Sequence, residues 1–137
     1  MPGLVLDASV SLAWMLPGEV DTEPAKQLIE MVSDQGAIVP SHWRLEVANA
    51  LLMAERRGRV TSEQVAALLD QLAALPISIA PETAARAWDA SPALARKHRL
   101  SLYDAAYLEL ALRKGLPLAS FDGALLRAAE TEQVARR

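Results

Sequence analysis

The chain contains no cysteine, and aromatic residues make up only 4% of its 137 positions. Without thiols there can be no disulfide framework, no thiolate nucleophile and no thiolate metal ligand. Only two histidines are present and they lie far apart, which leaves little scope for a zinc site, so any bound metal must be held by oxygen ligands. The scarcity of aromatic residues predicts an aliphatic core of Leu, Val, Ile and Ala, a composition that favours helices packed on a sheet.

Long apolar segments and an excess of basic residues are also missing. No apolar run approaches the ~20 residues that a membrane-spanning helix requires. No basic segment precedes the first apolar run either, so we expect a cytoplasmic protein that does not enter a membrane. The formal net charge of −3 argues against general, charge-driven binding to nucleic acid. Basic residues cluster locally, as at 56–59 and 96–99, and we interpret most of these clusters as solvated helix ends.

Short apolar runs alternate with segments of helical periodicity along the chain. Strands are predicted at 4–6, 37–39, 77–79 and 116–120, with a ragged last strand at 133–135. Helices are predicted at 9–16, at 23–32, from a cap at Ser41 to about 57, from a capping box at 61–64 to Pro76, after Pro81 with an interruption at 91–92, from a cap at Ser101 to 114, and at 122–130. This alternation predicts one α/β domain over 1–137, with a mostly parallel sheet of four to five strands sandwiched by helices.

Four carboxylates lie where the predicted sheet presents its carboxyl-terminal edge. Asp7 directly follows the first strand and Asp122 follows the fourth. Glu46 and Asp104 lie in the first turns of two helices, each on a face with small or apolar residues, where a carboxylate needs a partner. In a right-handed parallel arrangement all four side chains converge at one edge of the sheet, which is where open α/β sheets bind their ligands.

Each of the four acids also has a purely structural explanation. Asp7 and Asp122 are good N-cap residues, the helix dipole favours Glu46 near a helix start, and Asp104 fits a capping box that begins at Ser101. Their combination is what indicates a cation site, because converging like charges raise one another's pKa or recruit a cation. With oxygen ligands only, the expected cation is Mg²⁺, with Mn²⁺ as a substitute.

A carboxylate-bound divalent metal indicates hydrolysis of phosphodiesters, since the metal lowers the pKa of a bound water and stabilises charge on the phosphate. Ser9 and Ser120 each lie two residues from an acid and are suited to orient a carboxylate or a water, although a hydroxyl at a strand-to-helix turn is often only a cap. Asn49, one turn after Glu46, is a further candidate for hydrogen bonding to the site, with a buried structural amide as the alternative.

Four blocks of sequence carry a resemblance to a known family. They are LVLDASV at 4–10, followed by Trp14 and Pro17, then PSHWRLEVANAL at 40–51, LYDAAYLELA at 102–111 and GLPLASFD at 115–122. In this order and spacing the chain resembles a PIN domain, and within that family the VapC-type toxins of bacterial toxin–antitoxin pairs. The resemblance implies a metal-dependent endoribonuclease that cuts selected single-stranded sites in RNA, is inhibited by a cognate antitoxin protein and forms a homodimer.

Carried over position by position, the resemblance places the family's catalytic and metal-binding acids at Asp7, Glu46, Asp104 and Asp122. Ser120 stands where the family often has threonine, which keeps the hydroxyl. Antitoxins of this family lay a helix and an extended tail across a groove near the site. We expect four residues either to line such a groove or to lie in the core, with the core favoured for the second and the fourth: Trp14, Leu28, Trp43 and Leu52.

Other classes of protein compete with this interpretation. A phosphoacceptor receiver domain has a similar size and class, but it requires a second acid beside Asp7, an aspartate closing the middle strand and a lysine after Lys114. A phosphatase of the haloacid-dehalogenase type requires an aspartate at position 9, where this chain has Ser9. A non-catalytic α/β interaction module is the third alternative. The four carboxylates weigh against it, because without a metal their repulsion would destabilise the fold.

Overall fold

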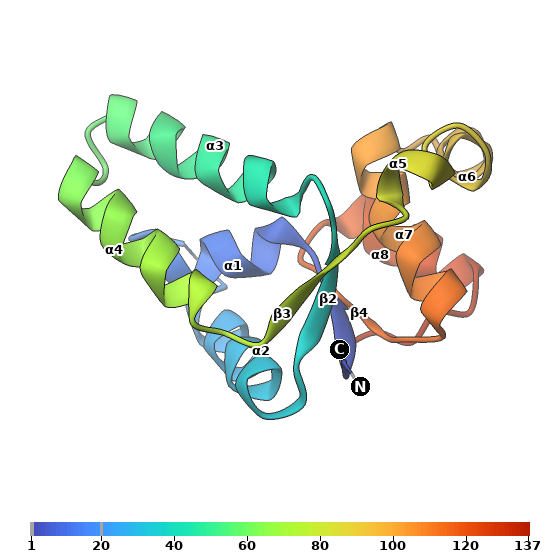
Figure 1. Cartoon of the computed structure of the whole chain (residues 1–137), viewed down its shortest axis with the longest axis horizontal. Helices are drawn as coiled ribbons and strands as arrows, with labels where there is room; N and C mark the ends of the chain where they lie inside the picture. Colours follow the sequence, from blue (N-terminus) through green and yellow to red (C-terminus); the bar gives the residue numbers. More distant parts are fainter. Residues whose placement is uncertain (1, 20) are drawn as a thin grey trace.

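The computed structural model of the chain describes residues 2–19 and 21–137. At its centre lies a four-stranded parallel sheet with the strand order β3-β2-β1-β4 (Figure 1). The strands are short, and they are β1 (Leu4–Leu6), β2 (Ala37–Pro40), β3 (Ile77–Ala80) and β4 (Leu118–Ala119). Every residue of β1 and β2 is buried, as expected for the central strands of a parallel sheet that is covered on both faces.

Helices cover the sheet in two layers (Figure 1). One layer holds α1 (Ala8–Met15), α2 (Thr22–Gln35), α3 (Trp43–Arg56) and α4 (Ser62–Ala73). The other holds α5 (Thr83–Arg86), α6 (Ala90–His98), α7 (Leu102–Lys114) and α8 (Gly123–Thr131). The chain runs from β1 through β2 to β3 at one edge, and then crosses the opposite face to reach β4 at the other edge. The order of the strands reverses its direction at the same crossover that moves the chain to the other face of the sheet. All the crossovers therefore have the same handedness. The predicted α/β sandwich is confirmed.

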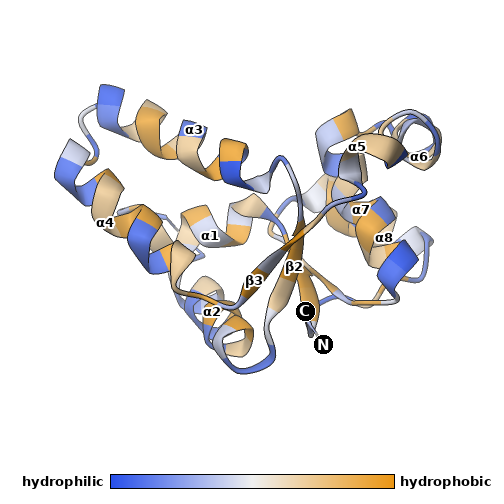
Figure 2. Ribbon diagram, viewed as in Figure 1, coloured by the Kyte–Doolittle hydropathy of each residue, from blue (hydrophilic) through white to orange (hydrophobic). Residues whose placement is uncertain are grey.

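The apolar core fills the space between the sheet and both helix layers. Figure 2 shows apolar residues along the strands and on the inner helix faces, with hydrophilic residues on the outside. Helix α7 is central to this core, because it packs against β1, β2 and β4 and buries Tyr107 completely. Its position explains its nearly continuous apolar sequence. The first turn of α7, which contains Asp104, is thereby fixed at the carboxyl-terminal edge of the sheet.

Helix starts show where local sequence signals determine the structure and where they do not. The predicted capping box at 61–64 is present at α4, and Ser101 caps α7 as predicted. Ser41 does not cap α3, because the helix starts later, after His42. The backbone N–H of Ser41 donates instead to Thr83 Oγ1 at 2.9 Å, in the chain that follows β3. A contact with a distant element has replaced the predicted local cap.

Two further boundaries differ from the predicted ones. The interruption expected at 91–92 falls at 87–89, since Asp89 is the N-cap of α6 and Pro92 lies within its first turn, where no intrahelical N–H bond is needed. The ragged last strand is reduced to a single parallel bridge between Leu118 and Arg136. None of the helices in the described ranges is long and apolar enough to cross a membrane.

Candidate active site

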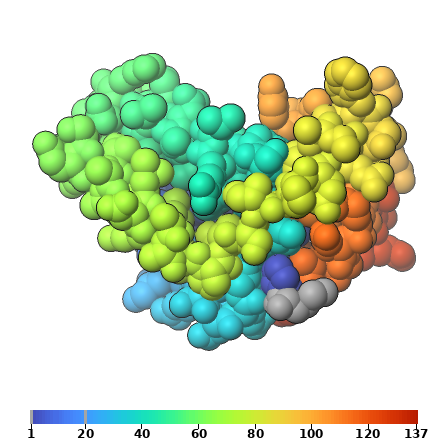
Figure 3. Space-filling model, in the orientation of Figure 1, coloured from blue at the N-terminus to red at the C-terminus, as the bar shows by residue number. Residues whose placement is uncertain are grey.

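The carboxyl-terminal edge of the sheet lies at the base of a hollow in the surface. Figure 3 shows this hollow between α3 on one side and the α5–α6 segment on the other. Only two residues separate the end of β2 from the start of α3, and the first turn of α7 lies on the same side of the sheet edge (Figure 1). The topology therefore directs four strand ends and helix starts towards one place.

Asp7 is the most buried acid of this edge, with 5% of its surface exposed. It occupies the N-cap position of α1, but its side chain makes no capping hydrogen bond, so a capping role for this carboxylate is wrong. Its Oδ2 atom accepts hydrogen bonds from Ser9 Oγ at 2.6 Å and from Ser120 Oγ at 2.7 Å. Both serines therefore contact the acid, as the sequence predicted.

The two serines are oriented by the chain that follows β4. The backbone N–H of Phe121 donates to Ser9 Oγ, and that of Asp122 donates to Ser120 Oγ, each at 3.0 Å. Because each hydroxyl accepts a main-chain hydrogen bond and has a single proton, that proton is directed to Asp7. These bonds join β1 to the segment after β4 and fix the orientation of the Asp7 carboxylate.

The surroundings of Asp7 disfavour its charge. The pKa of Asp7 is raised from 3.8 to about 6 in total: burial is the main cause, the hydrogen bonds from Ser9 and Ser120 lower it, and the charges of Asp104 and Glu46 add a smaller increase. The energetic cost of the ionised form is the property expected of a group that pairs with a cation when the site is in use.

Glu46 is held by two donors from different helices. Tyr107 Oη donates to Glu46 Oε1 at 2.7 Å, and His42 Nε2 lies 3.1 Å from the same oxygen. Burial acts to raise the pKa of Glu46, but the hydrogen bonds and the charge of His42, together with the Tyr107 bond, hold it below its usual value. Burial and the nearby Glu46 charge raise the pKa of Tyr107, so its hydroxyl stays protonated and remains a donor.

Sequence reasoning missed both donors to Glu46. His42 lies four residues before Glu46, a spacing that places two side chains on one helix face and was an available signal. Tyr107 lies on the same face of α7 as Asp104, but nothing in the sequence indicates that its hydroxyl reaches another helix. Asn49, by contrast, is exposed on α3, so the predicted buried amide is wrong.

Asp104 and Asp122 complete the acidic group. The backbone N–H of Asp104 donates to Ser101 Oγ at 3.1 Å, which is only the first half of a capping box, so the Asp104 carboxylate is not used at the helix start. Burial raises the pKa of Asp104, as do the charges of Asp122 and Glu46. Asp122 does cap α8, since its Oδ1 accepts from the backbone N–H of Leu125 at 3.0 Å. A capping oxygen leaves the second carboxylate oxygen of Asp122 for other contacts.

The four acids form one electrostatic group. Asp7 is affected by Asp104 and Glu46, and Asp104 is affected by Glu46 and Asp122. Within residues 2–19 and 21–137, no three acidic, histidine or cysteine side chains are arranged to hold a metal ion as they stand. The four acids nevertheless fit Mg²⁺ or Mn²⁺ chemically, because they offer carboxylate oxygens and a group of negative charges that a cation would compensate. Holding such an ion requires these side chains to move closer together.

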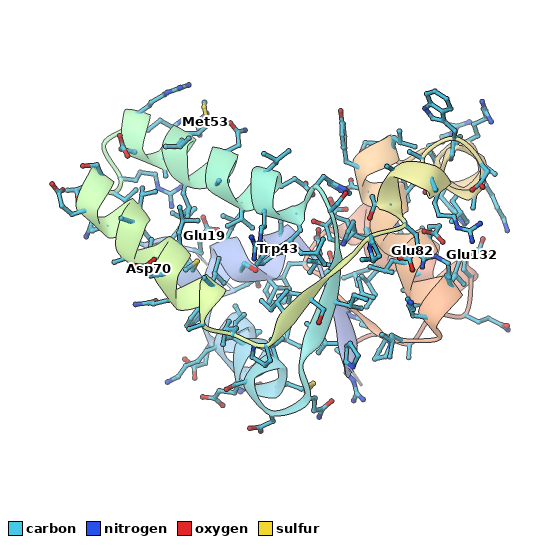
Figure 4. All side chains as sticks on the ribbon, in the orientation of Figure 1. Glu19, Trp43, Met53, Asp70, Glu82 and Glu132 are labelled. Carbon is cyan, nitrogen blue, oxygen red and sulfur yellow. The ribbon has the colours of Figure 1, made fainter. Side chains whose placement is uncertain are left out.

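Apolar residues near the site divide between core and surface. Leu28 is core as predicted, and Trp43 is buried and points from α3 into the angle between α3 and α4 (Figure 4). Leu52 is 45% exposed, so its predicted place in the core is wrong, because this face of α3 has no covering element. Trp14 is half-buried and lines a groove between the end of α1 and α4, whose polar lining residues are Thr22, Arg59 and Gln64. Its other apolar lining residues include Met15, Leu16, Val60, Ala67 and Leu68.

Comparison with known proteins agrees with this architecture. A family model described as the PIN domain matches residues 4–131. Ribonuclease VapC3 of Pyrobaculum aerophilum is 30% identical over 119 residues, which cover 87% of this chain and 88% of that protein. Ribonuclease VapC3 of Mycobacterium tuberculosis is 36% identical over 91 residues, which cover 65% of this chain and 62% of that protein.

Two solved structures share the fold. The crystal structure of PAE2754 from Pyrobaculum aerophilum superposes with a TM-score of 0.65 at 22% identity, covering 93% of this chain and 86% of that one. Mycobacterium tuberculosis VapC20, described as a sarcin–ricin loop cleaving toxin, superposes with a TM-score of 0.67 at 19% identity, covering 92% and 95%. Fold and site thus define an α/β protein with an acidic group at the carboxyl edge of a parallel sheet. The chain belongs to the PIN-domain family, among its VapC-like ribonucleases.

Proposed function

We propose that the protein is a metal-dependent endoribonuclease that hydrolyses phosphodiester bonds in RNA and acts as the toxin of a type II toxin–antitoxin pair. The observation that carries this proposal is the electrostatic coupling of four carboxylates from four separate elements. Clustered acids on unrelated parts of the chain destabilise a fold unless a cation or a proton compensates them. Membership of the VapC-like ribonucleases supports RNA as the substrate class.

In this proposal Asp7, Glu46, Asp104 and Asp122 are the catalytic residues and the ligands of Mg²⁺, with Mn²⁺ as a substitute. When bound, such a cation makes a water acidic enough to attack at neutral pH and stabilises charge on the phosphate. The chain's own contribution is to hold the carboxylates in place. Ser9 and Ser120 orient the Asp7 carboxylate. Asp122 caps α8, and this cap fixes the backbone at Asp122.

Two protein partners belong to the same proposal. The groove at Trp14 offers a place for an amphipathic helix of a cognate antitoxin, and the half-buried indole would supply a large contact area there. A second copy of the chain would cover the exposed apolar residues of α3. Leu45 and Leu52 are both exposed there, and their spacing of seven places them on one helix face.

The test is a cleavage assay with the purified chain, a mixture of structured RNAs and titrated Mg²⁺ or Mn²⁺. We expect metal-dependent cleavage that disappears in Asp104→Asn, because this variant keeps the size of the side chain and removes one charged ligand. Asp34→Asn is the matched control, since Asp34 is an exposed acid on α2 and its replacement should leave cleavage unchanged.

Two results would contradict the proposal. Cleavage that persists in Asp104→Asn, or in excess chelator, would show that the acidic group is not the nuclease site. Absence of both metal binding and cleavage in the wild-type chain would favour the non-catalytic interaction module instead.

A further inference from the structure

His42 connects the two helices that carry Glu46 and Asp104. Its Nε2 atom lies 3.1 Å from Glu46 Oε1, on α3, and 3.1 Å from the main-chain oxygen of Tyr103. Tyr103 immediately precedes Asp104 in the first turn of α7. The imidazole is 16% exposed, so water competes little for these contacts. A single nitrogen therefore joins the start of α3 to the start of α7.

The partners of His42 determine which ring nitrogen carries a proton. A main-chain carbonyl only accepts hydrogen bonds, and so does the ionised carboxylate of Glu46. Nε2 must therefore be protonated; its N–H donates to the Tyr103 oxygen, and Glu46 Oε1 lies 3.1 Å from the same nitrogen. With its proton engaged in this way, Nε2 is a donor within the site and not a metal ligand.

Packing fixes the ring in this orientation. The imidazole makes edge-to-face contacts with Tyr103 at a centroid distance of 5.7 Å and with Tyr107 at 5.3 Å. Tyr107 donates its hydroxyl proton to the same Glu46 oxygen that faces His42. Glu46 Oε1 is thus held by two donors, one from the start of α3 and one from α7, which leaves Oε2 as the oxygen available to a cation.

We propose that His42 is a positioning residue of the nuclease site, which sets the orientation of Glu46 and its separation from Asp104 so that both carboxylates can bind the same cation. This inference rests on the proposed function. A role in helix capping does not explain the contact, because His42 is the N-cap residue of α3 but its side chain makes no capping hydrogen bond. Partners that orient metal ligands typically change metal affinity by about 10- to 100-fold when they are removed.

The experiment compares His42→Ala, His42→Gln and His98→Ala with the wild-type chain. Mn²⁺ affinity is measured by calorimetry, and kcat and KM are measured on one RNA. We expect His42→Ala to weaken Mn²⁺ binding by about 10-fold or more and to lower kcat with little change in KM. His42→Gln should recover most of the affinity, because its amide nitrogen can reach the place of Nε2. His98 pairs with Glu132, a contact between the ends of α6 and α8, and serves as the control, with unchanged Mn²⁺ affinity.

The outcomes separate this role from the proposed function. Unchanged Mn²⁺ affinity in His42→Ala, or equal losses in the alanine and glutamine variants, would overturn the role of His42 while the wild-type activity stands. A wild-type chain that neither binds Mn²⁺ nor cuts RNA would overturn the proposed function, and this role with it. If His42→Ala does not fold, Tyr107→Phe replaces it, because this variant removes the other donor to Glu46 Oε1 and should weaken Mn²⁺ binding in the same direction.

Discussion

Asp7 is a carboxylate in surroundings that disfavour its charge. Burial raises its pKa in the folded protein to about 6, against 3.8 for an unperturbed group. Between these two values the folded state binds more protons than the unfolded state, so the free energy of unfolding falls as the pH rises. The destabilisation of the fold by the Asp7 charge is absent at a pH below the unperturbed pKa. It reaches about 3 kcal/mol at a pH above the pKa of the folded protein.

Asp7→Asn should therefore stabilise the metal-free protein at pH 7 while abolishing cleavage. Asparagine cannot ionise, and its side-chain oxygen can still accept from Ser9 and Ser120. We expect a gain of up to about 3 kcal/mol in unfolding free energy at pH 7 that disappears near pH 4. Urea unfolding in chelator at both pH values measures it, with Asp34→Asn as a control that should show no such gain. A variant that is less stable than the wild type at pH 7 would contradict the assigned cost of the Asp7 charge.

At the scale of single elements, α7 contains a buried charge. Glu109 carries a carboxylate, yet only 6% of its surface is exposed. Arg113 compensates it with two hydrogen bonds, Nε to Oε2 at 2.8 Å and Nη2 to Oε1 at 3.2 Å. The same guanidinium lies 3.3 Å from Glu82 Oε2, which precedes α5 (Figure 4). The ion pairs join α5 to α7 and support the helix that carries Asp104.

Arg113→Met should destabilise the fold by about 3 kcal/mol, because it keeps the aliphatic stem and leaves a buried carboxylate without its partner. The neighbouring Lys114→Met is the control. Lys114 lies 3.9 Å from Glu82 and is exposed, so its removal should cost no more than about 1 kcal/mol. Urea unfolding of both variants at pH 7 makes the comparison. Equal effects of the two substitutions would show that the Glu109 charge is not buried in solution.

The sequence predicted what depends on local pattern. Strand ends and helix starts were sufficient to select Asp7, Glu46, Asp104 and Asp122, because parallel topology brings such positions to one edge. The sequence did not predict which side chains are buried by contacts between elements that are distant along the chain. Helix periodicity could not show that α5 and α6 pack against α7, or that Leu52 remains exposed. The Tyr107–Glu46 bond joins residues 61 positions apart, and no local signal reports such a contact.

At the scale of the whole molecule, the acidic group exists only in the folded state. Asp7 and Asp122 lie at opposite ends of the chain, and the β1–β4 pairing with its two bridging serines brings them to one place. An unfolded chain has no such group, so a cation that binds the acids stabilises the fold by linkage. Repulsion among the carboxylates adds to this effect, because it destabilises the metal-free fold and a bound cation removes it.

Mg²⁺ should therefore raise the unfolding free energy of the wild-type chain at pH 7, by about 2.7 kcal/mol when its concentration is 100 times the dissociation constant. The increase should be smaller at pH 5, since protons compete for Asp7 below its pKa of about 6. Thermal unfolding with and without Mg²⁺ measures both values, and a sodium salt at matched ionic strength separates binding from screening. Asp7→Asn should show a reduced increase at pH 7. An equal increase with the sodium salt would show that no cation binds the acidic group, and that the four carboxylates are tolerated by the fold without one.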